Sequence, residues 1–147
     1  MRYLIIFFCL FFVESNAQIN EKISFESANP FALSDIITDL ENQKKQDVFG
    51  KLVIPSDSLN DNKKFPLIIA VAGSLGWREH HKEYLDMYQN SGFATFELNS
   101  FESRNIKSTV GSQVEVTTAA IILDAYRAFE KLANHPKIDK DKVSITG

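Results

Sequence analysis

The chain alternates between two hydrophobic patterns, and this alternation predicts strands interleaved with helices. Residues 65–72 (FPLIIAVA) form a continuous apolar run, and residues 93–98 (FATFEL) form a second, shorter one. Short apolar runs that contain β-branched and aromatic residues are typical of parallel strands buried on both faces. Residues 143–147 (VSITG) predict the start of a further strand of this kind.

Apolar residues recur with helical spacing between these strands. Residues 77–90 predict a helix, whose stripe at i, i+3, i+4 and i+7 consists of His81, Tyr84, Leu85 and Tyr88. Residues 112–133 predict a second helix, because Ser112 and Glu115 have the spacing of an N-terminal capping box. The segment before it, residues 99–111, is expected to be a long loop.

The N-terminal part of the chain has weaker patterns. Residues 22–26 predict a short strand. Residues 47–55 (DVFGKLVIP) predict another strand, in which Gly50 is expected to form a β-bulge. Residues 56–64 are expected to form a polar turn.

The order of these elements predicts one α/β domain. Strands that alternate with helices favour right-handed crossovers, which give a mostly parallel sheet with helices on both faces. No helix follows the last strand, residues 143–147, so a strand of interior character is left at an open edge. We therefore expect the domain to be incomplete, with its C-terminal half missing.

Residues 1–17 have the pattern of a secretory signal peptide. They begin with Arg2, continue with an uninterrupted apolar stretch and end with small residues in Ser15-Asn16-Ala17. A membrane anchor is the alternative, but the apolar stretch is far shorter than the roughly 20 residues that span a bilayer. We expect a mature domain of residues 18–147 that is secreted or periplasmic, with no stable membrane anchor after cleavage.

Composition narrows the chemistry of the mature domain. Cys9 is the only cysteine and would leave with the signal peptide, which excludes disulfides, a cysteine nucleophile and cysteine-based metal sites. The formal charge of −3 gives no basis for nucleic-acid binding. His80 and His81 are adjacent, so they cannot form the i, i+4 pair of a helical metal site. We expect His81 to be partly buried, His80 to be exposed, and no metal or organic cofactor.

Three segments together resemble the dienelactone hydrolase branch of the α/β-hydrolases. Residues 65–77 (FPLIIAVAGSLGW) resemble the strand and oxyanion loop of that family, with Ala72 where many relatives carry His. Residues 91–106 (SGFATFELNSFESRNI) resemble the next strand and its Ser-Phe-x-x-Arg loop. Residues 123–147 (LDAYRAFEKLANHPKIDKDKVSITG) resemble the helix and strand that lead into the nucleophile elbow, Gly-x-Ser-x-Gly.

The resemblance implies a serine hydrolase that acts on a small-molecule ester or lactone. Gly147 matches the first glycine of the elbow, so the nucleophilic serine is expected two positions after it. The Ser-Asp/Glu-His triad would then lie beyond residue 147, and the chain alone is predicted to be inactive. The backbone N–H groups of Ser74 and Leu75 are implied as oxyanion donors, with a plain glycine-rich turn as the alternative.

Arg104 is a candidate substrate-binding residue in this resemblance. In relatives that act on carboxylate-bearing lactones, an arginine in this loop contacts the substrate carboxylate, a task that suits the forked guanidinium group. The alternative is a structural arginine that pairs with Glu102 or Asp124. Asn99 stands where relatives often carry Asp, which is a departure from the family pattern.

Two other functions remain as alternatives. One is a non-catalytic secreted binding or interaction module with a hydrolase-like fold. The other is a nucleotide-binding domain, in which the loop of residues 73–76 (GSLG) would hold a phosphate. That loop lacks both the G-x-G-x-x-G pattern and a Gly-Lys-Ser/Thr ending.

Overall fold

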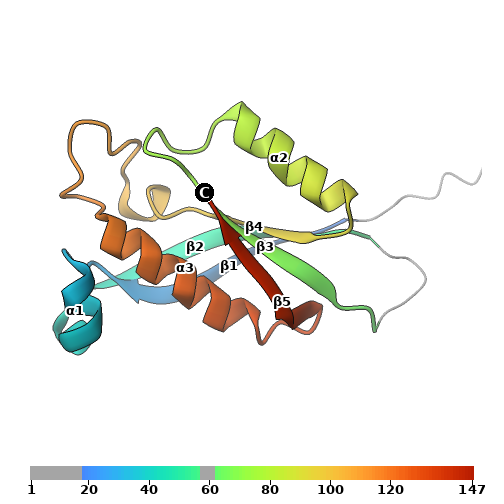
Figure 1. The fold of residues 1–147 in the computed structure, drawn as a ribbon, viewed down its shortest axis with the longest axis horizontal. Helices are drawn as coiled ribbons and strands as arrows, with labels where there is room; N and C mark the ends of the chain where they lie inside the picture. The colour runs from blue at the N-terminus through green and yellow to red at the C-terminus, as the bar shows by residue number, and fades with distance from the viewer. Residues whose placement is uncertain (1–17, 57–61) are drawn as a thin grey trace, which may run out of the picture.

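The computed structural model describes residues 18–56 and 62–147, and the expected signal peptide and most of the polar turn lie outside them. Strands and helices alternate along most of this part of the chain (Figure 1). The elements are β1 (Ile19–Ala28), α1 (Leu33–Thr38), η1 (Leu40–Asn42), β2 (Lys45–Ile54), β3 (Phe65–Val71), α2 (Glu79–Asn90), β4 (Ala94–Leu98), η2 (Glu102–Arg104), α3 (Thr118–Leu132) and β5 (Ile138–Thr146).

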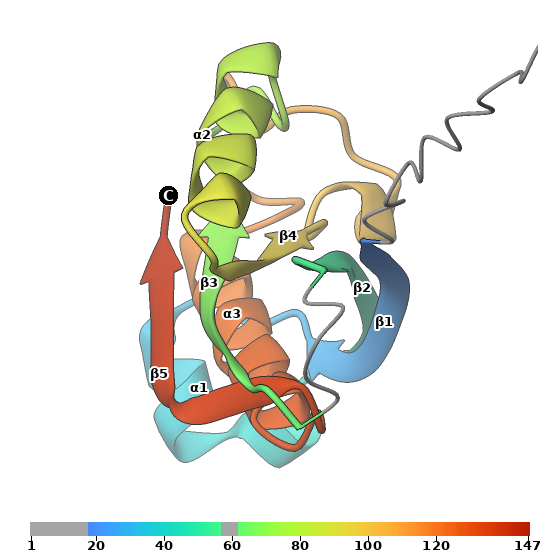
Figure 2. The ribbon, with the colours of Figure 1, turned by 90° about the vertical axis from the view of Figure 1, so that its right-hand side faces the viewer.

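The strands form one sheet in the order β1-β2-β4-β3-β5. β4, β3 and β5 pair in parallel, whereas β2 pairs antiparallel with both β1 and β4. It follows that β1, β3, β4 and β5 run in the same direction and β2 runs against them. Figure 2 shows β5 and β1 at opposite edges of the sheet. This mostly parallel α/β sheet confirms the predicted fold class.

Helices cover both faces of the sheet. Leu67 and Ile69 of β3 belong to one apolar cluster with Ala128 and Leu132 of α3. On the other face, the Gln89 side chain of α2 donates a hydrogen bond to Thr95 of β4 at 2.8 Å. Alternate residues of a strand point to opposite faces, so α2 and α3 lie on opposite sides, as Figure 1 also shows.

The core lies between α3 and the central strands. Its fully buried large side chains include Leu52 of β2 and Phe96 of β4. Gly50 does not form the expected bulge, because the β1–β2 register continues without interruption past the Ile23–Gly50 pair. The glycine is needed for another reason: a Cβ at position 50 would collide with the Phe96 ring. Close packing of an aromatic ring on the backbone therefore replaces the predicted bulge.

The predicted start of α3 is wrong. The helix begins at Thr118, and Thr117 is its N-cap, with a side-chain oxygen that accepts the N–H of Ala120 at 3.0 Å. The same hydroxyl donates to the Pro30 carbonyl at 2.6 Å. Thr117 thus satisfies a free helix N–H and fastens the helix to the segment after β1. Ser112 lies before the helix and caps nothing.

Helix α2 buries fewer side chains than its predicted apolar stripe implied. The helix begins at Glu79, and Leu85 is its buried residue, whereas Tyr84 is 58% exposed. The short helix α1 was not predicted, and it adds nothing to the buried core, because none of its residues is buried and both Leu33 and Ile37 are exposed. Among the described residues, no helix is long and apolar enough to cross a bilayer.

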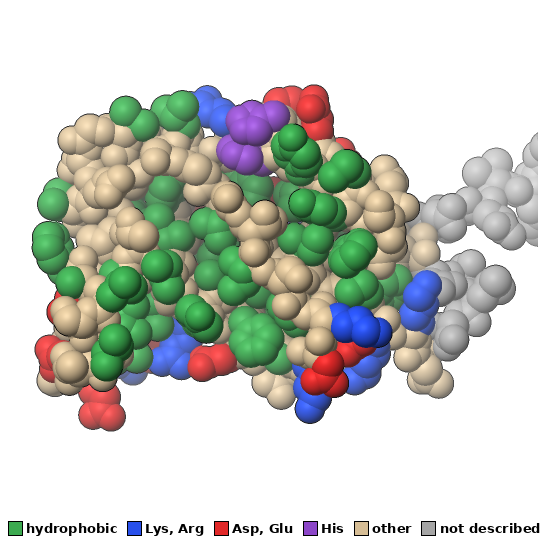
Figure 3. All heavy atoms as spheres, in the orientation of Figure 1, with side chains coloured by type: hydrophobic (Ala, Val, Ile, Leu, Met, Phe, Trp, Pro, Cys, Tyr) green, Lys and Arg blue, Asp and Glu red, His purple; other side chains and the backbone are tan. Residues whose placement is uncertain are grey.

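Apolar side chains gather in the middle of the face drawn in Figure 3, the region that β3 and β5 occupy in Figure 1. β5 pairs with β3 on one side only, and Ile145 near its end is 47% exposed. An edge strand with unpaired backbone groups and exposed apolar side chains promotes association. β5 therefore forms one edge of the described sheet, and β1 forms the other.

Candidate active site

The loop after β3 lies at the edge of the sheet where the parallel strands end. Its turn is closed by a hydrogen bond from the Gly76 N–H to the Gly73 carbonyl at 2.8 Å. Gly76 has a φ of +73°, and a Cβ there would lie 3.1 Å from the Lys107 carbonyl. The left-handed conformation and this close approach both favour glycine at position 76.

The carbonyl of Ser74 points to a second loop, the one that joins β4 to α3. It accepts hydrogen bonds from the Thr109 N–H at 2.9 Å and from the Ser108 hydroxyl at 3.0 Å. The N–H groups of Ser74 and Leu75 have no hydrogen-bond partner within the described part of the chain. These two donors therefore have the availability that an oxyanion site requires, although their role stays a prediction.

Trp77 ties the end of this loop to the sheet. Its indole N–H donates to the Leu98 carbonyl at the end of β4, at 3.2 Å. The indole ring meets the His81 ring edge-on, with centroids 5.5 Å apart. Trp77 thus links the β3 loop, the end of β4 and the first turn of α2.

His81 closes the first turn of α2. Its Nδ1 accepts the backbone N–H of Arg78 at 2.9 Å, which requires that Nδ1 carry no proton. Partial burial lowers the pKa of His81, and the charges of His80 and Arg78 lower it further. His81 is half-buried and His80 is exposed, which confirms the prediction for both residues.

The two loops enclose a cleft of about 710 Å³. Its apolar lining comes from both loops and from α3, and includes Leu75, Trp77, Phe101, Ile106 and Ile121. Its polar lining includes Asn99, Ser100 and Asn105, and its charged lining is Arg78, Lys82, Glu97, Glu102 and Lys107. The cleft thus combines apolar surface with polar and charged groups, and it lies where the parallel strands end, as small-molecule sites in α/β sheets do.

Arg104 does not line this cleft. Its side chain is 4% exposed and forms a bidentate pair with Asp124, at 2.7 Å from Nη1 and 3.1 Å from Nη2. Nε donates to the Asn29 side chain at 2.6 Å, while Nη1 and Nη2 also donate to the carbonyls of Ser100 and Ala28. All five N–H donors of the guanidinium group are therefore used. This geometry gives no support to a substrate contact, and it matches the structural alternative, pairing with Asp124.

The partner carboxylate is fully buried. Asp124 of α3 has no exposed side-chain surface, and its Oδ1 also accepts the Ser27 hydroxyl at 2.6 Å. The network joins α3, the end of β1 and the loop after β4. A buried ion pair of this kind holds its elements in one arrangement, because removing either partner leaves an uncompensated charge.

Gly147 lies beside the end of β3. A Cβ at this position would stand 3.1 Å from the carbonyl oxygen of Val71. Figure 1 shows the C-terminal end of β5 near the loop that leaves β3. Gly147 and the loop with Ser74 and Leu75 thus lie at the same edge of the sheet.

No constellation of catalytic side chains is assembled in the described residues. The His81 ring accepts the Arg78 N–H, and the His135 ring accepts the Lys137 N–H and lies beside the Glu21 carboxylate. None of these is the hydroxyl of a serine nucleophile. The same part of the chain has no group of three or more His, Asp or Glu side chains that could hold a metal ion.

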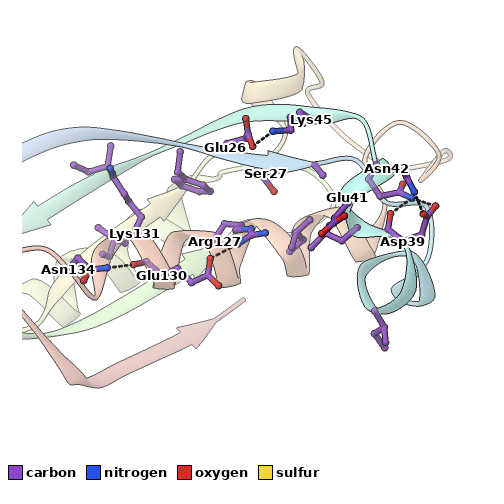
Figure 4. Close-up of a pocket in the computed structure, with 18 of the residues that line it drawn as sticks. Glu26, Ser27, Asp39, Glu41, Asn42, Lys45, Arg127, Glu130, Lys131 and Asn134 are labelled. Carbon is purple, nitrogen blue, oxygen red and sulfur yellow. Dashed lines mark hydrogen bonds and ion pairs between the residues drawn. The ribbon is translucent and has the colours of Figure 1, made fainter.

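A larger groove, of about 1170 Å³, runs along α3 between β1 and the α1–η1 segment. Its charged side chains mostly pair with each other: Glu26 with Lys45, and Arg127 with Glu130, each at 2.7 Å (Figure 4). None of Ser74, Leu75 or Gly147 lines it. Of these three residues, Leu75 lines the smaller cleft, which also lies at the edge where the parallel strands end, so we take the smaller cleft as the candidate active site.

Comparison with known proteins finds similar folds among solved structures. No family model matches the chain, and no curated protein matches it. Solved structures do match. A candidate dienelactone hydrolase from Klebsiella pneumoniae subsp. pneumoniae has a TM-score of 0.54 at 16% identity, over 86% of this chain and 50% of that one. A structure named m3DLH has a TM-score of 0.57 at 16% identity, over 88% of this chain and 48% of that one.

The esterase Est22 has a TM-score of 0.53 at 15% identity, over 87% of this chain and 33% of that one. The chain therefore spans half or less of the length of these structures. The matches support the resemblance inferred from the sequence motifs. The chain has an α/β-hydrolase fold, shared with dienelactone hydrolase-like proteins and esterases.

Proposed function

We propose that the chain is the N-terminal part of a secreted serine hydrolase that cleaves ester or lactone bonds. The observation that carries the proposal is one juxtaposition at the end of the parallel strands. The N–H groups of Ser74 and Leu75, which lack partners among the described residues, lie at the same edge as Gly147. In the proposed complete protein, the serine two positions after Gly147 follows β5 into the nucleophile elbow.

The proposed reaction assigns a separate task to each part. The serine attacks the ester carbonyl carbon, and a histidine from the later chain accepts the serine proton, oriented by an Asp or Glu. The carbonyl oxygen becomes negatively charged and accepts hydrogen bonds from Ser74 and Leu75. Each such donor stabilises the transition state by about 2.7–4 kcal/mol in a serine hydrolase. The C–O bond to the alcohol breaks as histidine returns the proton to it, which leaves the acyl group as an ester of the serine. Water then loses a proton to the histidine and attacks this ester, which releases the acid and restores the serine hydroxyl.

Hydrolysis by the complete protein tests this function. The protein is expressed from the full reading frame and assayed with 4-nitrophenyl butyrate. Alanine in place of the serine two positions after Gly147 is expected to reduce kcat by about 10⁴-fold or more. Ser144→Ala is the matched control, because Ser144 lies within β5 and pairs with Ile68 of β3. Equal rates for the wild type and the elbow variant would rule out the proposed nucleophile.

Secretion is a separate part of the proposal. It is supported by the pattern of residues 1–17, which lie outside the described structure. Mass spectrometry of the exported protein is expected to find Gln18 as its first residue. A mature protein that retains Arg2 and its apolar stretch would contradict cleavage. That result would leave the hydrolase assignment unaffected.

A further inference from the structure

Ser100 carries a buried hydroxyl with no partner. Its Oγ is the one buried side-chain oxygen or nitrogen without a hydrogen bond in residues 18–56 and 62–147. The residue is 5% exposed, follows β4 closely and belongs to the lining of the cleft. A buried hydroxyl without a hydrogen bond is costly, because it has lost its bonds to water. An unpaired buried hydroxyl calls for a partner, and a residue that lines a cleft can meet one in a bound ligand.

The surrounding contacts fix the position of Ser100. Arg104 donates from Nη1 to the Ser100 carbonyl at 2.9 Å, and Asp124 holds the same guanidinium group. The backbone is thus held in place, so the oxygen moves by rotation about the Cα–Cβ bond, and the O–H bond turns about the Cβ–Oγ bond. The Oγ has almost no exposed surface in the structure, so a ligand in the cleft that Ser100 lines reaches this oxygen only after the side chain has rotated.

We propose that Ser100 determines substrate specificity by donating a hydrogen bond to an oxygen in the non-scissile part of the substrate. This inference rests on the proposed function. Leu75, Trp77 and Ile106 offer apolar surface for a carbon skeleton in the same cleft. The substrate class is therefore an ester or lactone that carries an additional ether, hydroxyl or carbonyl oxygen. An all-carbon analogue leaves the Ser100 hydroxyl unpaired and is discriminated against for that reason.

The test compares matched esters on the complete protein. One pair, 4-nitrophenyl methoxyacetate and 4-nitrophenyl butyrate, differs by an oxygen in place of a methylene in the acyl chain. A second pair, 2-methoxyethyl acetate and butyl acetate, differs in the same way in the alcohol. The preference is the ratio of kcat/KM for the oxygen-containing ester to that of its partner. Ser100→Ala is expected to lower this ratio about 5- to 10-fold in at least one pair.

Ser103→Ala is the matched control from the same loop. The Ser103 hydroxyl donates to the Asn99 carbonyl at 2.7 Å and accepts the Phe49 N–H at 3.1 Å, and the residue does not line the cleft. This variant is expected to lower the melting temperature and leave both ratios unchanged. Ser100→Ala is expected to melt no lower than the wild type. Ratios that are the same in wild type and Ser100→Ala for both pairs overturn the proposal.

A binding measurement separates this inference from the proposed function. Amide analogues of the same pairs are added, and the rise in melting temperature is recorded. The wild type is expected to respond more to the oxygen-containing amide of at least one pair, and Ser100→Ala to lose this difference. If the wild type hydrolyses none of the esters, the proposed function fails while the amides still decide the role of Ser100. If the difference between the two amides is the same in the wild type and in Ser100→Ala, the proposed role of Ser100 is overturned.

Discussion

Two regions at the same end of the sheet differ in whether their hydrogen-bond donors have acceptors within the protein. Around Arg104, every guanidinium N–H has a protein acceptor, and the partner Asp124 is fully buried. Around Ser74 and Leu75, two backbone N–H groups have no partner among the described residues, and the nearby Ser100 hydroxyl is unpaired. Satisfied polar groups hold a structure together, whereas pre-positioned unsatisfied ones bind ligands.

Arg104→Met in the complete protein should give the largest effect on stability. The substitution leaves Asp124 as a buried, unpaired charge, which typically costs about 3–5 kcal/mol in the free energy of unfolding. Chemical denaturation measures the loss. The double variant Arg104→Met/Asp124→Leu is expected to recover part of it, because no isolated charge remains. A loss below about 1 kcal/mol in the single variant would contradict the assigned role of the network.

Gly76→Ala tests the region with unpaired donors, the loop after β3 that carries Ser74 and Leu75. A left-handed conformation costs a non-glycine residue about 1–2 kcal/mol, and the new Cβ also crowds the Lys107 carbonyl. The free energy of unfolding should fall by about that amount, and kcat toward 4-nitrophenyl butyrate should fall because the adjacent donors move. Gly73→Ala is the matched control, since a Cβ there meets nothing within 4 Å. Equal kcat values for the two variants would contradict the requirement at position 76.

Thr117→Ala tests the observed helix cap against the predicted one. Loss of the bond to the Ala120 N–H is expected to cost about 1–2 kcal/mol in the free energy of unfolding. Ser112→Ala serves as the comparison and should stay within about 0.5 kcal/mol of the wild type. Denaturant midpoints of the two variants measure the difference. A larger loss of stability in Ser112→Ala than in Thr117→Ala would identify Ser112 as the cap.

The smallest effect should come from pH, through His81. Its pKa is lowered in the folded protein, so the unfolded chain binds more protons as the pH falls below about 6.5. Stability from neutral His81 is therefore complete above about pH 6.5 and is lost as the pH falls through the lowered folded pKa. His81→Gln should flatten this part of the profile of melting temperature against pH. An unchanged profile would exclude a contribution from His81, and His80→Gln is the matched control.

The buried strands were predictable from the sequence because a strand that is buried on both faces is a continuous run of apolar residues. The apolar runs at 65–72 and 93–98 correspond to β3 and β4 in the structure. The body of α3 was predictable for a similar reason, since its buried residues repeat with helical spacing. The motifs in the same segments also carried the resemblance that the solved structures support.

Features that depend on distant partners were not predictable in this way. Thr117 caps α3 and contacts Pro30, which lies far back in the sequence. Arg104 is withdrawn from the cleft by Asn29 and Asp124, and neither contact leaves a local pattern. Ser100 begins the Ser-Phe-x-x-Arg loop that the sequence singled out, so the motif marked its position. The missing partner of its hydroxyl appears only in three dimensions.

Covalent labelling of the complete protein tests the central claim most directly. A fluorophosphonate reacts with an activated serine nucleophile, and mass spectrometry locates the modified residue. The account predicts one adduct, on the serine two positions after Gly147, and slower labelling in Gly76→Ala because the adjacent oxyanion donors are displaced. A folded complete protein with no adduct, or with its adduct on a serine elsewhere, would contradict the assignment of this edge of the sheet as the active site.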